Sequence, residues 1–344
     1  MFRPTLTALD LRPSEEEREA LATGGLVRIP LETGLNVGPV NVTLVLGDKP
    51  AIIDGALHHA DNLEQLERSL HTYDLSLSDI QEVWLTHPHI DHFGLTGAII
   101  KQSGATTYAL NDGVYRFNDY LTYWYSDRQA FHNHVKEHGG QPDTLEGILS
   151  SQSTFNVVST PFTVDHSFQA GETLRIAGTY DVIPLHTPGH TPWCTSYWFP
   201  ETDMLIVGDA LRQKMRFNMI LYTAEDVSPE FQGLSCFQDS LRKLQDIPAQ
   251  WVVPGHGKAF TNHAKTINFA LKRQQKRCNL MLNALEDLGP TTAFDMALHM
   301  YNRSITESAL LLVMSDTIAL LEWLHEQGQV TRDLEEGIVR FQLA

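Results

Sequence analysis

Residues 87–92 read His-Pro-His-Ile-Asp-His and directly follow the stretch Glu-Val-Trp-Leu-Thr at 82–86. The preceding stretch is typical of a buried strand. A turn after that strand can direct the first two histidines one way, and the aspartate and the last histidine another. Because zinc accepts imidazole nitrogens and carboxylate oxygens as ligands in proteins, this spacing predicts a metal site.

Three more polar side chains follow apolar stretches of the sequence, each in a turn that contains glycine. They are His190 after 182–185, Asp209 after 205–207 and His256 after 251–253. Sites in layered αβ folds gather at the carboxyl ends of strands. We therefore expect these three side chains to join the first cluster.

The order and spacing of these motifs over residues 24–260 resemble those of the metallo-β-lactamase superfamily, in particular its glyoxalase II-like and lactonase-like hydrolases. The resemblance implies an α/β fold, the four-layer αββα sandwich. It also implies a hydrolase that holds two Zn²⁺ ions, with iron and manganese as competitors for the site. The implied ligands are His87, His89 and His190 for the first ion, Asp91, His92 and His256 for the second, and Asp209 as the bridge.

The implied chemistry is hydrolysis of an ester-type bond, in a thioester, lactone or related acyl substrate, by a hydroxide held between two metal ions. Asp91 and Asp54 are the candidate catalytic residues. Asp91 is expected to orient the nucleophile and to carry a proton to the leaving group. Asp54, at the family's first motif, either fixes a ligand or its loop or is a turn residue before Gly55. Three residues stay open between ligand support and a structural role: Thr86, His186 and Thr191.

The residues after Asp209 depart from the patterns of the family's lactonases and of glyoxalase II. Ala-Leu-Arg-Gln-Lys follows at 210–214, and no tyrosine occurs before Tyr222. The basic residues here either grip an anionic group, such as a carboxylate or a phosphate, or form a solvated loop. They are Arg212, Lys214 and Arg216. Cys194 is out of register with the cysteine ligand of the true β-lactamases and is expected to be a small buried side chain.

Residues 112–155 are expected to form a helical insertion between the second and third motifs, with seven aromatic side chains within 115–131. These aromatic side chains either form a lid or pocket wall for an apolar acyl group or pack the insertion onto the domain or a second subunit. A lid favours a fatty-acyl or aromatic-acyl substrate, and subunit packing allows a homodimer.

Residues 264–344 are expected to form helices followed by a hairpin at 330–343, a small winged-helix-like module after a catalytic domain at 1–263. Lactamase-β-like endoribonucleases carry a similar extension, so an endoribonuclease or another nucleic-acid-processing enzyme is the alternative function. However, residues 271–344 hold 7 Lys/Arg against 10 Asp/Glu, and a nucleic-acid-binding helix is expected to be basic.

Overall charge and cysteine content limit the partners and the compartment. A formal net charge of −17 repels phosphate backbones and anionic lipid surfaces, so we expect a small-molecule acyl substrate, and neither a nucleic-acid nor a membrane partner. The three cysteines form no Cys-x-x-Cys motif, which favours a reducing cytoplasm. No stretch reaches the ~18 apolar residues of a membrane span, and the first 20 residues lack the apolar core of a secretory signal.

Overall fold

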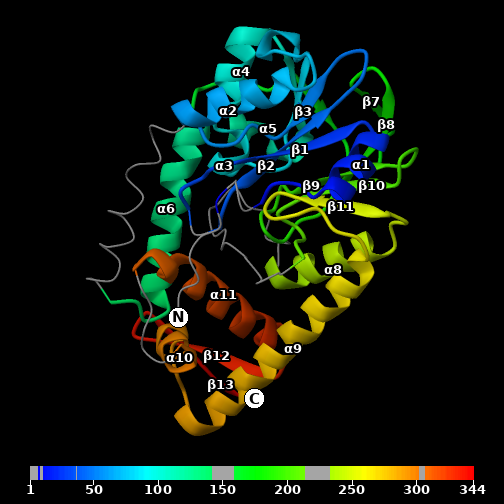
Figure 1. The fold of residues 1–344 in the computed structure, drawn as a ribbon. Helices are drawn as coiled ribbons and strands as arrows, with labels where there is room; N and C mark the ends of the chain where they lie inside the picture. Colours follow the sequence, from blue (N-terminus) through cyan, green and yellow to red (C-terminus); the bar gives the residue numbers. More distant parts are fainter. Residues whose placement is uncertain (1–6, 8–10, 36, 142–158, 214–232, 302–306) are drawn as a thin grey trace.

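Two β-sheets form the centre of the computed structural model, which describes residues 7, 11–35, 37–141, 159–213, 233–301 and 307–344 (Figure 1). The first sheet has the order β1-β2-β3-β4-β5-β6, antiparallel from β1 to β3 and parallel from β3 to β6. Its strands are β1 (Leu26–Leu31), β2 (Val40–Val45), β3 (Ala51–Ile53), β4 (Glu82–Trp84), β5 (Thr106–Leu110) and β6 (His166–Phe168).

The second sheet has the order β11-β10-β9-β8-β7, and only the pair of β10 and β11 is parallel. Because β9 is antiparallel to both β8 and β10, the strands β8, β10 and β11 run in the same direction. Their carboxyl ends therefore meet at one edge. The strands are β7 (Leu174–Ile176), β8 (Tyr180–His186), β9 (Thr195–Phe199), β10 (Met204–Gly208) and β11 (Trp251–Pro254).

Helices cover the outer face of each sheet and complete four layers (Figure 1). Leu66 belongs to the hydrophobic cluster outside the first sheet, Phe237 to the cluster outside the second, and Trp84 to the cluster between the sheets. The predicted αββα sandwich is confirmed. The covering helices are α2 (Ala60–His71) and α4 (Thr96–Ser103) on the first sheet, and α8 (Gly233–Gln245) and the start of α9 (His263–Leu288) on the second.

Local sequence accounts for these elements. All six residues of β2 are buried, as expected of a central strand covered on both faces. In α2, Leu66 and Leu70 lie four residues apart on one side of the helix and are fully buried. Except for the buried Asn62, the polar residues of α2 are exposed or half-buried, and His59 caps the first turn by accepting from the Asp61 N–H.

The remaining elements are short or lie away from the sheets. They are α1 (Glu15–Thr23), α3 (Ile90–Phe93), α5 (Val114–Asn118), α6 (Tyr120–Glu137), α10 (Ala293–Met300), α11 (Glu307–Glu326), β12 (Val330–Glu335) and β13 (Ile338–Leu343). The expected insertion is helical in α5 and α6, and its residues 142–155 lie outside the described part of the chain. The expected C-terminal helices and hairpin are confirmed, with Glu336 and Gly337 in the turn.

The C-terminal elements share their core with the sandwich. Leu241 of α8, Met281 of α9, Leu321 of α11 and Phe341 of β13 belong to a single hydrophobic cluster. A division of the chain at residue 264 therefore stays a prediction. Among the described residues, no helix has the length and apolar character that crossing a bilayer requires.

Candidate metal centre

All seven predicted ligand residues meet at one edge of the sandwich, between the two sheets. The reason is topological, because each residue follows the carboxyl end of a strand and those ends lie together. The segment 87–92 follows β4, His190 lies in the loop after β8, Asp209 directly follows β10, and His256 follows β11. Within the described residues, ligand atoms converge in three groups: His87/His89/His190, His87/His92/Asp209 and Asp91/His92/His256.

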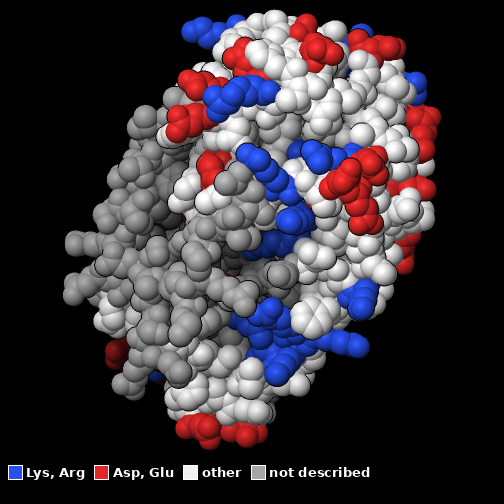
Figure 2. Space-filling view, viewed as in Figure 1, with Lys and Arg blue, Asp and Glu red and all other residues white. Residues whose placement is uncertain are grey.

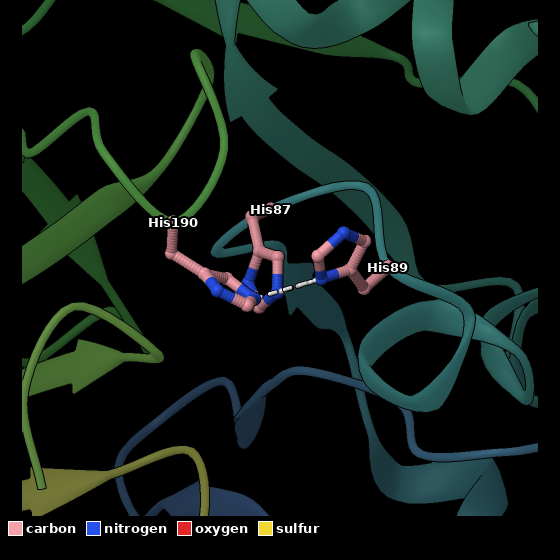
Figure 3. A group of neighbouring side chains, drawn as sticks. All are labelled: His87, His89 and His190. Atoms are coloured by element: carbon pink, nitrogen blue, oxygen red, sulfur yellow. Dashed lines mark hydrogen bonds between the residues drawn. The ribbon is translucent and has the colours of Figure 1, made fainter. Parts of the chain in front are cut away.

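The first group brings three imidazole rings from two loops together, as Figure 3 shows. The Nδ1 atom of His89 lies 3.1 Å from Nε2 of His87 and 2.9 Å from Nε2 of His190. Two nitrogens bound tetrahedrally to one zinc ion at ~2.0–2.1 Å lie about 3.3 Å apart. The observed spacing is therefore close to that of a three-histidine metal site.

The second group combines Asp91, His92 and His256, and Asp209 lies between it and the first group. The Nε2 atom of His256 is 3.3 Å from Asp91 Oδ2. Asp209 Oδ2 is 3.6 Å from that same nitrogen and 3.5 Å from His190 Nε2 in the first group. Asp209 Oδ1 faces His92 Nε2 at 3.6 Å. A single carboxylate thus faces ligands of both groups.

Asp54 orients one histidine of each group. His92 Nδ1 lies 2.7 Å from the Asp54 carboxylate, which can only accept, so Nδ1 carries a proton and Nε2 is the nitrogen that can bind a metal. The Thr86 hydroxyl donates to Asp54 at 2.8 Å, so its oxygen accepts from His87 Nδ1 at 3.0 Å. This arrangement fits the predicted role in fixing a ligand, and it gives Thr86 a supporting contact that the sequence left open.

His256 is oriented by a backbone carbonyl instead. Its Nδ1 donates to the Pro39 carbonyl at 2.9 Å, which again leaves Nε2 directed at the other ligands. The neighbouring residue has to be small, because a Cβ on Gly255 would overlap Asp209 Oδ1 and lie 2.6 Å from His92 Cε1. The backbone of the loop after β11 therefore lies so close to Asp209 and His92 that no side chain fits at position 255.

The protein groups alone leave this cluster incompletely satisfied. Three buried side-chain atoms of the cluster have no hydrogen-bond partner among the described residues: His92 Nε2, His256 Nε2 and Asp209 Oδ1. Within the same part of the chain, none of the carboxylates of Asp54, Asp91 and Asp209 forms a salt bridge with Lys or Arg. Buried acceptors and anions without partners are costly, and cations satisfy both. The residues present therefore fit a divalent metal.

The protonation states of the side chains in the cluster also bear on metal binding. Burial lowers the pKa of His89 to about 3, with a contribution from a neighbouring imidazole. Burial acts to raise the pKa of Asp91, but His256 and the other histidines hold it well below its usual range. Burial likewise opposes protonation of His92, yet Asp54 raises the pKa of His92 to about 10. A metal ion that binds His92 must therefore displace a proton.

The other singled-out residues shape the loop that carries His190. His186 Nε2 lies 2.7 Å from the Pro192 carbonyl, and the Thr191 N–H faces Cys194 Sγ at 3.3 Å. These contacts favour structural roles for His186 and Thr191. Cys194 is buried and free, as expected, and burial raises its pKa to about 12. Of the basic residues after Asp209, Arg212 helps to lower the pKa of Asp209, whereas Lys214 and Arg216 lie outside the described residues.

The helical insertion docks on the same loop. The guanidinium of Arg116, in α5, lies 4.0 Å from the ring centre of Trp193 and 2.6 Å from the Asp127 carboxylate. Arg116 is 2% exposed and Trp193 is 6% exposed. Because Trp193 is three residues from His190, the insertion packs against the loop that carries this histidine.

Residues 35–256 match the family model of the metallo-beta-lactamase superfamily, and residues 278–344 match that of the metallo-beta-lactamase-like C-terminal domain. The probable metallo-hydrolase YqjP of Bacillus subtilis is 26% identical over 323 residues, 93% of this chain and 98% of that protein. A hydroxyacylglutathione hydrolase of Rhodospirillum rubrum is 32% identical over 127 residues, 36% of this chain and 43% of that protein. The crystal structure of a metallo-beta-lactamase family protein from Thermus thermophilus has a TM-score of 0.77 at 25% identity, over 93% of this chain and 99% of that chain.

We predict that Asp54→Asn weakens metal binding at both groups by about 10–100-fold. The amide carries no negative charge, and its NH₂ group would have to face either the Thr86 N–H or the His92 Nδ1–H, which both donate to the carboxylate. Metal affinity is measured by competition with a chromophoric chelator. Asp165→Asn is the matched control, because Asp165 accepts from the N–H and hydroxyl of Thr107 in the same way, away from the ligands. Equal metal affinities in the two variants would show that Asp54 does not orient the ligands.

Proposed function

The chain belongs to the metallo-beta-lactamase superfamily and is a metallo-hydrolase, and from this premise we propose that it cleaves an ester-type bond of an acyl substrate at a dinuclear metal centre. The observation that carries the proposal is the position of Asp209, which faces His190 of one group at 3.5 Å and His256 of the other at 3.6 Å. A carboxylate in that position suits a ligand shared by two ions.

The donor set favours zinc, because five imidazoles and two carboxylates are ligands that zinc accepts, although iron and manganese compete for such sites. Two divalent cations bound there would supply an activated water near neutral pH and stabilise a developing oxyanion. Asp91 is ionised at neutral pH and lies beside His256, so it can accept a hydrogen bond from the attacking water. When that water attacks, the carboxylate would take the proton that the water loses and give the same proton to the leaving group.

The insertion supports a substrate with an apolar acyl group. Tyr120 of α6 packs against Phe93 with ring centres 4.8 Å apart, and α3, which holds Phe93, also carries Asp91. The Tyr120 hydroxyl is buried and has no hydrogen-bond partner in the part of the chain that the structure describes. Burial raises the pKa of Tyr120, and the negative charges of Asp91 and Asp127 raise it further. Aromatic rings with one polar group suit the walls of a small-molecule pocket.

One relative supports the acyl class directly. The hydroxyacylglutathione hydrolase that is 32% identical over 127 residues acts, by its name, on an acyl group carried by glutathione. A thioester or lactone presents the same reacting atom, an acyl carbon with a good leaving group. We therefore place thioesters and lactones ahead of other ester-type bonds as candidate substrates.

One observation favours the alternative, a nucleic-acid substrate. The C-terminal part is net acidic as a whole, but its cations gather on one helix, and Figure 2 shows basic side chains over the middle of α9. No Asp or Glu occurs between residues 263 and 285 of this helix. Its four exposed basic residues are Lys265, Lys272, Arg273 and Lys276. Such a face suits phosphate groups, whether of RNA or of a phosphorylated acyl carrier.

We expect two metal ions per chain after saturation, measured by elemental analysis. Asp209→Ala is expected to lose at least one ion, and its kcat/KM is expected to fall about 10²–10⁴-fold, because a bound ion contributes several kcal/mol. Asp239→Ala is the control, since that carboxylate is exposed on α8 and pairs only with Arg242 among the described residues. One ion in the parent chain contradicts the dinuclear proposal, and two ions in Asp209→Ala contradict the role of Asp209 as the shared ligand.

A substrate panel tests the reaction. Acyl-CoA, an acylhomoserine lactone, nitrocefin and single-stranded RNA are incubated with the metal-loaded chain, and Asp209→Ala serves as the blank. Turnover of the thioester or the lactone is the expected result. Cleavage of RNA alone would establish the alternative and exclude an acyl substrate.

A further inference from the structure

We propose that Asn41 of β2 is a positioning residue for His256, and that a buried ion pair between Arg28 and Glu17 holds Asn41 in place. The inference rests on the proposed function, because it takes His256 as a metal ligand of the second group. Asn41 is 2% exposed, and its amide contacts the backbone of the loop after β11 rather than a ligand side chain. Its effect on the metal is therefore exerted through the backbone of the loop after β11.

Asn41 grips that loop on both sides of His256. Its side-chain amide donates to the Pro254 carbonyl at 2.7 Å and to the Gly257 carbonyl at 2.8 Å. Its backbone N–H donates to the Gly255 carbonyl, also at 2.7 Å. The backbone N–H and both amide N–H groups of Asn41 thus donate to carbonyls of this loop. These carbonyls extend from two residues before His256 to one residue after it.

Arg28 fixes which way the amide faces. Its Nη1 donates to Asn41 Oδ1 at 2.9 Å, so the oxygen of the amide is held on the Arg28 side and the NH₂ group must face the loop. Arg28 Nε in turn donates to Glu17 at 2.5 Å, and both side chains are almost completely buried. Glu17 also accepts from the Ala259 N–H at 3.4 Å, which adds a contact at the far end of the loop.

The loop needs this support because little movement is tolerated there. His256 Nε2 has to face both Asp91, at 3.3 Å, and Asp209, at 3.6 Å. A Cβ does not fit at Gly255, so the backbone is already as close to Asp209 as it can be. Groups that hold metal ligands from outside typically affect metal affinity by about 10–100-fold. Asn41 meets that description through the backbone rather than through a ligand side chain.

The test is Asn41→Ser, which keeps a small polar side chain but cannot reach both carbonyls. The two stepwise metal dissociation constants are measured by chelator competition, together with the melting temperature. We expect one constant to rise about 10–100-fold and the other to stay within about threefold, because the first group lies on other loops. A purely structural role would lower the melting temperature and leave the ratio of the two constants unchanged.

Asn62→Ser is the matched control. Asn62 is 1% exposed, and its amide also donates to two backbone carbonyls, those of Glu32 at 2.7 Å and Leu57 at 3.2 Å. Neither of these carbonyls belongs to a ligand or to a residue that the structure shows bonded to a ligand side chain. We expect a loss of melting temperature similar to that of Asn41→Ser, with both metal dissociation constants unchanged.

A second variant covers the case in which Asn41→Ser does not fold. Asn41→Asp keeps the shape and the contact with Arg28 but sets a carboxylate against two carbonyl oxygens, so the same selective loss is expected. Unchanged constants in the folded variant overturn the inference while leaving the dinuclear proposal intact. A parent chain that binds a single ion contradicts the proposed function, and the inference with it.

Discussion

The hydrogen bonds from His92 and Thr86 to Asp54 are the interactions on which the site depends. An imidazole binds a metal through only one nitrogen, and the proton on the other nitrogen decides which one is available. The Asp54 carboxylate settles this for His92 directly and for His87 through Thr86. One buried anion thus prepares ligands in both groups. Its own negative charge also adds to the need for cations nearby.

That carboxylate is placed by the end of a short strand. Asp54 follows β3 with φ of 65°, a left-handed conformation that aspartate adopts more readily than most residues. Its N–H donates to the Trp84 carbonyl at 2.8 Å, at the end of the neighbouring strand β4. The turn at Asp54 therefore lies beside the end of β4, where the segment 87–92 begins shortly afterwards. The geometry of the cluster follows from the registration of two parallel strands.

The sequence predicts well which side chains gather in the cluster, because the signals of these residues are local. Each follows an apolar stretch, and 87–92 holds four of them within a single turn. It does not predict the groups that hold the ligands, because those contacts join distant segments: Asn41 and Pro254 are 213 residues apart. A hint exists in Asn41 itself, an amide inside the buried apolar strand β2. The sequence also carries no strong period over strands β5 and β6 or helix α1.

The metal-binding cluster and the helical insertion come from different parts of the chain, and they are connected through the loop after β8. His190 belongs to the buried cluster, and Trp193, three residues on, forms the surface on which Arg116 of the insertion rests. A change in the insertion can therefore reach a ligand through a single short loop. The cations of α9 act at longer range, since in a chain of net charge −17 an exposed basic face selects where an anionic substrate first makes contact. The family assigns hydrolysis as the reaction, and under the proposed function the insertion and the cations of α9 would narrow the range of acyl substrates that reach the cluster.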